Sequence, residues 1–243
     1  MGPWFVAPPQ CWTTGDVQLP EDESHHALRV LRVSPPDVIT VIDGEGIVAR
    51  CAVRSIEDKS VIAEVVERSI HRRQRPEVVV YQGTAKSSKV DSVVERLAEL
   101  GVAETYAFES SRSVARWDEQ KVQRLDERWA VIARSAAKQS RNPFVMGTKA
   151  GLDFSDLLAR IGREPLAACL WEEASLPLRT ALLSPAERVA LVVGPEGGLE
   201  RAEAEALADA GAQLVSLGPR ILRTENAAFA ATSALLFHYG LIG

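Results

Sequence analysis

The sequence contains few cysteines, and their arrangement excludes two kinds of stabilisation. The three cysteines among the 243 residues lie far apart and form no CxxC pair; they are Cys11, Cys51 and Cys169. They do not combine with the four histidines at the spacing of a metal site. An odd number of dispersed cysteines is typical of buried thiols in a reducing compartment. We therefore expect neither a metal ion nor a disulfide framework.

Targeting segments and membrane spans are also missing from the sequence. The N-terminus, MGPWFVAPPQ, has no basic segment followed by an apolar core. No apolar run reaches the roughly 18 residues of a transmembrane helix. The composition, 46% hydrophobic and 25% charged, is that of a globular protein with a buried core. The sequence predicts a cytoplasmic protein, and its net charge of −5 does not exclude a local basic surface.

The pattern of apolar residues divides the chain into two predicted domains, 1–72 and 73–243. Three β-branched segments in the first part, separated by glycine and Asp-Lys turns, predict a small β-barrel. The basic segment HRRQRP follows as a linker. Strands and helices then alternate, which predicts a parallel sheet with helices on both faces. The expected strands of the whole chain are 37–43, 46–53, 60–69, 78–84, 104–110, 166–172, 188–194 and 213–218, and the expected helices are 87–100, 118–140, 154–161, 199–211 and 225–240. Ser87 or Ser88 can cap the first of these helices.

Two strand ends near the C-terminus carry glycine-rich turns, in VVGPEGGLE (192–200) and in LVSLG (214–218). Glycine lets a backbone approach a ligand closely, and the helix start after each turn offers free N–H groups. Neither turn has the GxGxxG or GxxxxGK[ST] pattern of nucleotide-binding loops. A simple connection between strand and helix is the alternative. We expect the two turns to lie side by side and to form one pocket at the carboxyl edge of the sheet.

The segment LGPRILRTENAAFA (217–230) places unusual charge at the start of the last helix. A capped helix explains Thr224 as the cap, and it explains Glu225 and Asn226 in the first turn, where the helix dipole favours a carboxylate. It does not explain Arg220 or Arg223, because a helix N-terminus repels a cation. We therefore favour a functional role for Arg223.

Two further groups of charged residues are candidates for binding or catalysis. Arg134, Lys138 and Arg141 share one side of the 118–140 helix, opposite an apolar stripe of Val122, Leu125, Trp129, Ile132 and Ala136. No acidic residue occurs between Trp129 and Lys149. This helix side is either a solvated face or a surface for RNA phosphates. Glu172 and Glu173 follow a predicted strand; they are either ordinary exposed acids, or one of them binds a hydroxyl pair or accepts a proton.

Six segments of the chain resemble one known family. They are VVGPEGG followed by LGPRILRTENA, with ERLAELGV (95–102), SSRSV (110–114), SAAKQSR (135–141) and HHALRVLR (25–32) in support. Together they resemble the bacterial 16S ribosomal RNA uracil-N3-methyltransferases of the SPOUT superfamily. The resemblance implies a PUA-like N-terminal β-barrel that binds RNA and a C-terminal α/β domain with a trefoil knot. It also implies a homodimer that binds S-adenosylmethionine in the knot.

The same resemblance implies an activity, methylation of N3 of a uridine of 16S ribosomal RNA in the small ribosomal subunit. Arg223 and Arg112 would stabilise the charge that develops on the uracil oxygens, and Glu173, with Glu225 as second choice, would accept the N3 proton. The implied cofactor-binding residues are Leu170, Glu172, Val193, Gly194, Glu196, Gly197, Gly198, Leu217, Gly218, Ile221, Leu222, Asn226 and Ala227. The implied RNA-binding residues are Arg32, Arg72, Arg73, Lys86, Arg134, Lys138 and Arg141.

The chain departs from the family pattern at three places, and two alternative functions remain. Asn226 stands where the family usually has Thr, Gln139-Ser140-Arg141 lacks a Gly, and Ser135 often corresponds to Glu. The last two departures concern RNA contacts rather than the cofactor site. The chain could instead methylate a transfer RNA or a ribose hydroxyl, or it could be an RNA-binding assembly factor without catalysis. Cofactor binding separates the last alternative from the enzymes.

Overall fold

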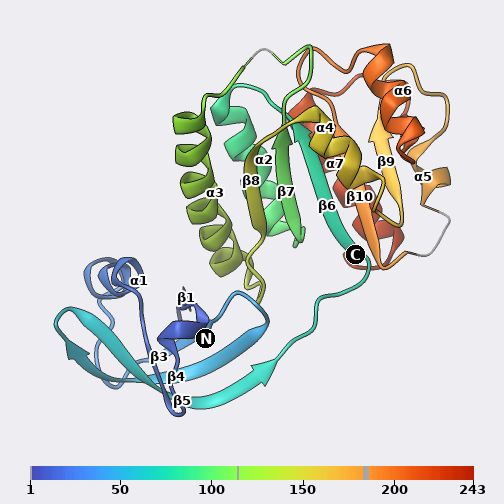
Figure 1. Cartoon of the computed structure of the whole chain (residues 1–243). Helices are drawn as coiled ribbons and strands as arrows, with labels where there is room; N and C mark the ends of the chain where they lie inside the picture. The colour runs from blue at the N-terminus through green and yellow to red at the C-terminus, as the bar shows by residue number, and fades with distance from the viewer. Residues whose placement is uncertain (1, 114, 183–185) are drawn as a thin grey trace. The chain divides into compact units, whose positions relative to one another are not determined.

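The computed structural model describes residues 2–113, 115–182 and 186–243, so Val114 of the SSRSV motif lies outside the described residues. The chain forms two compact units (Figure 1). The first comprises the chain up to Arg73 together with Arg134–Val145, and the second comprises Gln74–Ala133 and Met146–Gly243. Each unit has its own sheet and its own buried core.

The first unit is built on a five-stranded sheet with the order β1-β3-β4-β5-β2. Its strands are β1 (Trp4–Val6), β2 (Asp16–Gln18), β3 (Val38–Ile42), β4 (Ile47–Glu57) and β5 (Ser60–Ile70). All neighbours pair antiparallel except β1 and β3, which pair parallel. The short helix α1 (Glu21–His25) continues into a π-helical turn at His26–Val30, and a 3-10 turn covers Pro9–Cys11.

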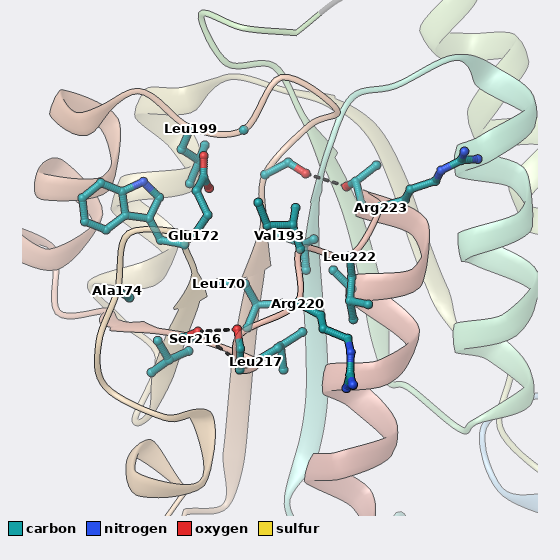
Figure 2. Close-up of a pocket in the computed structure, with 18 of the residues that line it drawn as sticks. Leu170, Glu172, Ala174, Val193, Leu199, Ser216, Leu217, Arg220, Leu222 and Arg223 are labelled. Atoms are coloured by element: carbon teal, nitrogen blue, oxygen red, sulfur yellow. Dashed lines mark hydrogen bonds between the residues drawn. The ribbon is translucent and has the colours of Figure 1, made fainter.

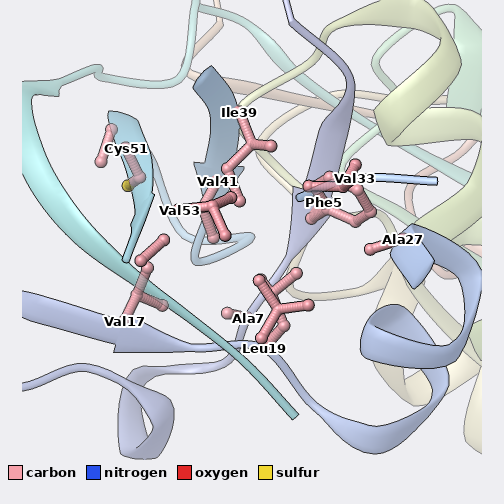
Figure 3. Close-up of a cluster of buried hydrophobic side chains, with 13 residues drawn as sticks. Phe5, Ala7, Val17, Leu19, Ala27, Val33, Ile39, Val41, Cys51 and Val53 are labelled. Atoms are coloured by element: carbon pink, nitrogen blue, oxygen red, sulfur yellow. The ribbon is translucent and has the colours of Figure 1, made fainter. Parts of the chain in front are cut away.

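The core of the first unit follows from the alternation of side chains along the strands. Ala49, Cys51 and Val53 of β4 point inward and are buried, and Phe5 and Ile39 meet them in the core shown in Figure 3. The three strands expected between residues 37 and 69 are confirmed, whereas β1, β2 and α1 were not predicted. Strands of three residues are too short for a recognisable alternation.

The second unit contains a six-stranded parallel sheet with the order β11-β9-β10-β6-β7-β8. Its strands are β6 (Glu77–Gly83), β7 (Glu104–Phe108), β8 (Gly147–Leu152), β9 (Ala167–Leu170), β10 (Arg188–Val193) and β11 (Gln213–Val215). Its helices are α2 (Ser87–Glu99), α4 (Phe154–Ile161), α5 (Leu178–Ala181), α6 (Arg201–Asp209) and α7 (Thr224–His238). In Figure 1, α4 lies in front of this sheet and α2 and α7 lie behind it.

The expected fold class is therefore confirmed: a parallel-sheet α/β unit preceded by a small β unit. Strand β8 was not predicted, because its sequence GTKAGL has too few apolar residues for a strand pattern. The trefoil knot stays a prediction from the resemblance. The predicted domain boundary between residues 72 and 73 also stays a prediction. The two compact units add one observation about this boundary, and it concerns helix α3.

Helix α3 (Glu119–Ser140) contributes to both units. Trp129 is fully buried in the second unit, where its indole N–H donates to Asp91 Oδ1 at 2.9 Å. Ala137, two turns later, packs in the first unit against Val6 and Ile42. A helix of this length extends about 33 Å, which is enough to serve two cores. Sequence pattern alone assigns a continuous helix to one domain, so this division requires the tertiary structure.

Two predicted helix caps are wrong. Lys86 occupies the N-cap position of α2 without a side-chain hydrogen bond, so neither Ser87 nor Ser88 caps that helix. Arg223 is the N-cap of α7, and Thr224 is its first helical residue. The Thr224 hydroxyl instead forms contacts with segments of the central sheet.

The cysteines are free thiols, and burial raises the pKa of Cys51 to about 11 and that of Cys169 to about 12.

Candidate functional site

The second unit has a pocket of about 970 Å³ at the carboxyl edge of its sheet (Figure 2). Its walls come from the segments that follow β9, β10 and β11, together with the first turn of α7. The two glycine turns do form one pocket, as expected. They are not side by side, because β9 lies between β10 and β11 in the sheet. The turn after β9 therefore forms the middle of the wall.

Backbone conformation explains why glycine occurs where these segments turn. Gly198 and Gly218 have φ angles of +71° and +117°, a region that side chains disfavour. Gly83, at the end of β6, permits a close approach of a different kind. A Cβ atom there would lie 2.3 Å from the nitrogen of Pro195, so only glycine lets the 194–195 turn pack against β6. Glycine therefore shapes the pocket in two ways: Gly198 and Gly218 form part of its lining, and Gly83 supports the lining from behind.

The lining of the pocket combines apolar side chains with exposed backbone and carboxylates. The apolar side chains include Leu170, Val193, Leu217 and Leu222, and the carboxylates are Glu172, Glu196 and Glu225. Within the described part of the chain, the amides of Ile221 and Leu222 donate no backbone hydrogen bond. The pocket therefore offers a flat apolar ligand both dispersion contacts and backbone polar groups.

The first turn of α7 is held by a lysine that sequence reasoning missed. Lys89, in the first turn of α2, pairs with Glu196, and its Nζ lies 3.9 Å from Glu225 Oε1. The other oxygen, Glu225 Oε2, is buried and has no hydrogen-bond partner among the described residues. A cation in the first turn of a helix is opposed by the dipole. A cation near a helix N-terminus was the sequence signal that singled out Arg223, and the same signal was present for Lys89.

Arg220 and Arg223 line the pocket, and neither forms an ion pair with any residue that the structure describes. Glu225, next in sequence but one, therefore does not serve as a structural partner of Arg223. Figure 2 shows the Arg223 side chain extending away from Leu170, Glu172 and Val193. The guanidinium is thus available to a second ligand beside the apolar part of the pocket.

Three of the predicted site residues do not line the pocket. Asn226 is exposed, and its backbone amide donates to Arg223 O. Arg112 lies against the glycine turn that follows β10, with Nη1 3.5 Å from Gly197 O and Nε 3.8 Å from Glu200. Glu173 is exposed and forms an ion pair with Arg201. The other predicted cofactor residues, and Arg223, line the pocket.

The predicted RNA-binding residues differ in burial and in the contacts that they make. Lys138 Nζ lies 2.6 Å from Glu23 Oε1, and Arg134 lies 3.7 Å from Asp22. The absence of acids near these residues in sequence is therefore compensated by α1 in space. Arg73 lies over the Phe144 ring at 4.5 Å. The exposed residues of the predicted set are Arg32, Arg72, Lys86 and Arg141.

The described residues contain neither a membrane-spanning helix nor a metal centre. No helix among them is both long enough and apolar enough to cross a membrane. In the same part of the chain, no group of three or more His, Cys, Asp or Glu side chains is arranged to hold a metal ion.

Two protein families match the two parts of the chain. The RNA methyltransferase domain matches residues 72–236, which include the whole pocket. The RNA methyltransferase PUA domain matches residues 19–66, in the first unit.

Individual relatives match almost the whole chain. Ribosomal RNA small subunit methyltransferase E of Mycobacterium tuberculosis is 36% identical, over 88% of this chain and 83% of the relative. The protein of the same name from Bacillus subtilis is 33% identical, over 91% and 90%. A crystal structure of this enzyme from Neisseria gonorrhoeae, bound to S-adenosyl methionine, has a TM-score of 0.85 at 27% identity and covers 98% of each chain. The chain therefore belongs to the ribosomal RNA small subunit methyltransferase E family.

Proposed function

We propose that this protein transfers a methyl group from S-adenosylmethionine to N3 of one uridine of 16S ribosomal RNA, the uridine numbered 1498 in the family. The observation that carries the proposal is the pocket at the carboxyl edge of the parallel sheet, built from the two turns that the family resemblance singled out. The names of the relatives support methylation of small-subunit ribosomal RNA. The proposal that N3 of the uracil is the methylated atom comes from the family resemblance of the sequence.

The residues of the pocket fit this cofactor by their chemistry. Leu170, Val193 and Leu217 provide apolar contacts for an adenine ring, and the free backbone amides of the 220–223 segment suit its polar edge. The pocket carboxylates offset the positive charge of a sulfonium, and the unpaired buried oxygen of Glu225 is one such group. The same carboxylates would repel a polyphosphate. The site therefore favours a cationic nucleoside over a nucleotide.

The bound cofactor supplies an electrophilic methyl group, and the protein must supply position and charge. Holding N3 in line with the methyl group is an entropic task for the pocket walls. The uracil must also lose its N3 proton, and negative charge then develops on its two oxygens. Arg223 would donate hydrogen bonds to that charge, and in support its guanidinium has no ion-pair partner among the described residues. Arg112, beside Gly197, is a second donor.

We assign the N3 proton to Glu225 rather than to Glu173. Glu225 lines the pocket and keeps one buried oxygen unpaired, whereas Glu173 forms an ion pair with Arg201 and does not line the pocket. Lys89 Nζ lies 3.9 Å from the other oxygen of this carboxylate, Glu225 Oε1. A general base has to be within reach of the proton, and Glu225 meets this condition better than Glu173 because it lines the pocket.

The partners follow from the same proposal. The exposed basic residues Arg32, Arg72, Lys86 and Arg141 would contact RNA phosphates, and the protein would act in the cytoplasm as a homodimer. Arg134 and Lys138 also remain RNA candidates, although their ion pairs with α1 compete for the same charge. Replacing Lys86 should lower the slope of log affinity against log salt by about one charge.

The test uses small ribosomal subunits from a strain that lacks the enzyme. The protein is incubated with these subunits and S-adenosylmethionine, and the nucleosides are separated by mass spectrometry. N3-methyluridine at a single site is the expected product. A ribose-methylated nucleoside, or methylation of transfer RNA only, would replace the proposed substrate by the first alternative. Absence of cofactor binding in calorimetry would identify an assembly factor instead.

A further inference from the structure

A buried chain of hydrogen bonds joins three segments that are distant in sequence. Thr224 Oγ1 donates to Gly194 O at 2.6 Å (dashed in Figure 2), and Gln82 Nε2 donates to Thr224 Oγ1 at 2.7 Å. Gln82 is only 1% exposed and lies on β6, while Gly194 follows β10 and Thr224 begins α7. The chain of bonds therefore fixes the start of α7 to the ends of two central strands.

The direction of every bond in this chain is determined by its acceptors. The carbonyl oxygens of Gly194 and Gly83 can only accept, and Gln82 Nε2 also donates to Gly83 O at 3.0 Å. The Thr224 hydroxyl has one hydrogen, which it gives to Gly194 O, so it must accept from the Gln82 amide nitrogen. If the amide turned over, Gln82 Oε1 would face Gly83 O and the Thr224 hydroxyl, and both bonds that Nε2 donates would be lost. The chain is consequently rigid.

Fold stability alone does not explain a glutamine at this position. Gln82 Oε1 is buried and has no partner among the described residues, which costs about 1–3 kcal/mol. An apolar side chain of similar length would fill the same space without that penalty. What the glutamine adds is the bond to Thr224, whose neighbours in sequence are Arg223 and Glu225.

We propose that Gln82 and Thr224 are positioning residues for methyl transfer. By fixing the first turn of α7 against Gly194, they orient the N-cap residue Arg223 and the pocket residue Glu225. The inference rests on the proposed function, because it gives these two residues their partners in the reaction. A displacement of about 1 Å at a reacting group can lower a rate by about 10²-fold. Loss of the bond should therefore affect turnover more than folding.

Thr224→Val tests this inference, because valine keeps the shape of threonine without its hydroxyl. Its matched control is Thr232→Val on the same helix, where the threonine is fully buried and its Oγ1 has no partner among the described residues. We expect Thr224→Val to lower the single-turnover rate at saturating cofactor and RNA by about 10- to 100-fold. Thr232→Val should leave that rate unchanged. Thr224→Ser should restore most of it, and Gln82→Met should reproduce part of the loss without a further loss when combined with Thr224→Val.

Rates are measured well below the melting temperature of each variant, so that a merely structural role does not lower them. Equal rates for Thr224→Val and Thr232→Val would overturn the inference while leaving the proposed function intact. If the wild-type protein transfers no methyl group, the proposed function fails and the inference fails with it, an outcome that the wild-type rate distinguishes from equal rates in an active protein.

Discussion

Charged side chains are paired differently at the amino and carboxyl edges of the parallel sheet. At the amino edge, Arg188 begins β10 and lies 3.1 Å from Glu104, 3.0 Å from Glu164 and 3.6 Å from Glu77. Tyrosine hydroxyls complete this network: Tyr106 donates to Glu104, and Tyr81 donates to Glu164 at 3.2 Å. The charged groups there are matched within the protein.

At the carboxyl edge, several charged groups have no partner among the described residues. Arg220 and Arg223 make no ion pair there, and one oxygen of Glu225 is buried without a hydrogen bond. Arg220 and Arg223 are exposed to solvent, so the cost in stability falls on the buried Glu225 oxygen, and such a group is retained where a ligand completes its pairing. In the proposed function one sheet therefore separates its tasks, with stability at the amino edge and binding at the carboxyl edge.

The largest expected effect is at Arg223. Arg223→Lys keeps the charge but loses the planar donor pair, so turnover should fall by about 10²-fold while cofactor affinity and thermal stability hardly change. Single-turnover methylation and thermal melting measure the two quantities. Arg163→Lys, at an exposed arginine outside the pocket, is the matched control. Lost stability in Arg223→Lys would show that the carboxyl edge also uses its charge for folding.

At the amino edge the expected effect is on folding. Arg188→Met leaves three carboxylates without their common partner, and the free energy of unfolding should fall by about 1–3 kcal/mol. The value is below that of a fully buried pair because the Arg188 side chain is 27% exposed. Denaturant unfolding measures it, and methyl transfer by the folded variant should be normal. A variant that folds normally but lacks activity would remove the distinction between the two edges.

Gly83→Ala should weaken cofactor binding from outside the pocket. The new Cβ would lie 2.3 Å from Pro195 N, so the 194–195 turn must move. We expect affinity for S-adenosylmethionine to fall about tenfold, or about 1.4 kcal/mol, in calorimetry. Gly15→Ala, where a Cβ meets nothing within 4 Å, provides the control. Gly197→Val is a poorer probe, because its Cβ would already lie 3.0 Å from Arg112 O, so a loss of affinity could come from a moved Arg112.

The smallest expected effect is a change in the alkaline stability profile. Burial, and then the Glu164 carboxylate, raises the pKa of Tyr81 above its ordinary value of 10.0. A raised pKa in the folded state means that this contribution is complete below pH 10 and is lost as the pH rises further. Tyr81→Phe should cost about 1 kcal/mol at pH 7, from the lost hydrogen bond, and its deficit should shrink above pH 10. Denaturant titrations at pH 7, 10 and 11 measure the difference, and a deficit that grows with pH would contradict the prediction.

Residues in this chain differ in how far sequence could predict their role. The two glycine turns were found because strand, glycine and helix start are adjacent in sequence. The order of strands was not found, since it depends on which strands pair. Arg134 and Lys138 illustrate the same limit, because their acidic partners come from α1, more than a hundred residues earlier. Lys89 was missed for the same reason, as its partners Glu196 and Glu225 follow it by over a hundred residues.

The sequence by itself determined the α/β class, the glycine turns and the arginine that opposes a helix dipole. These depend on the period of apolar residues and on local backbone preferences, which act over a few neighbouring positions. The tertiary structure alone decided that β9 separates the two turns, that α3 serves two cores, and that Thr224 bonds to Gly194 and Gln82 instead of capping α7. Hydrogen bonds and ion pairs between distant segments exist only once the chain has folded, because their partners are brought together by the packing of the whole unit.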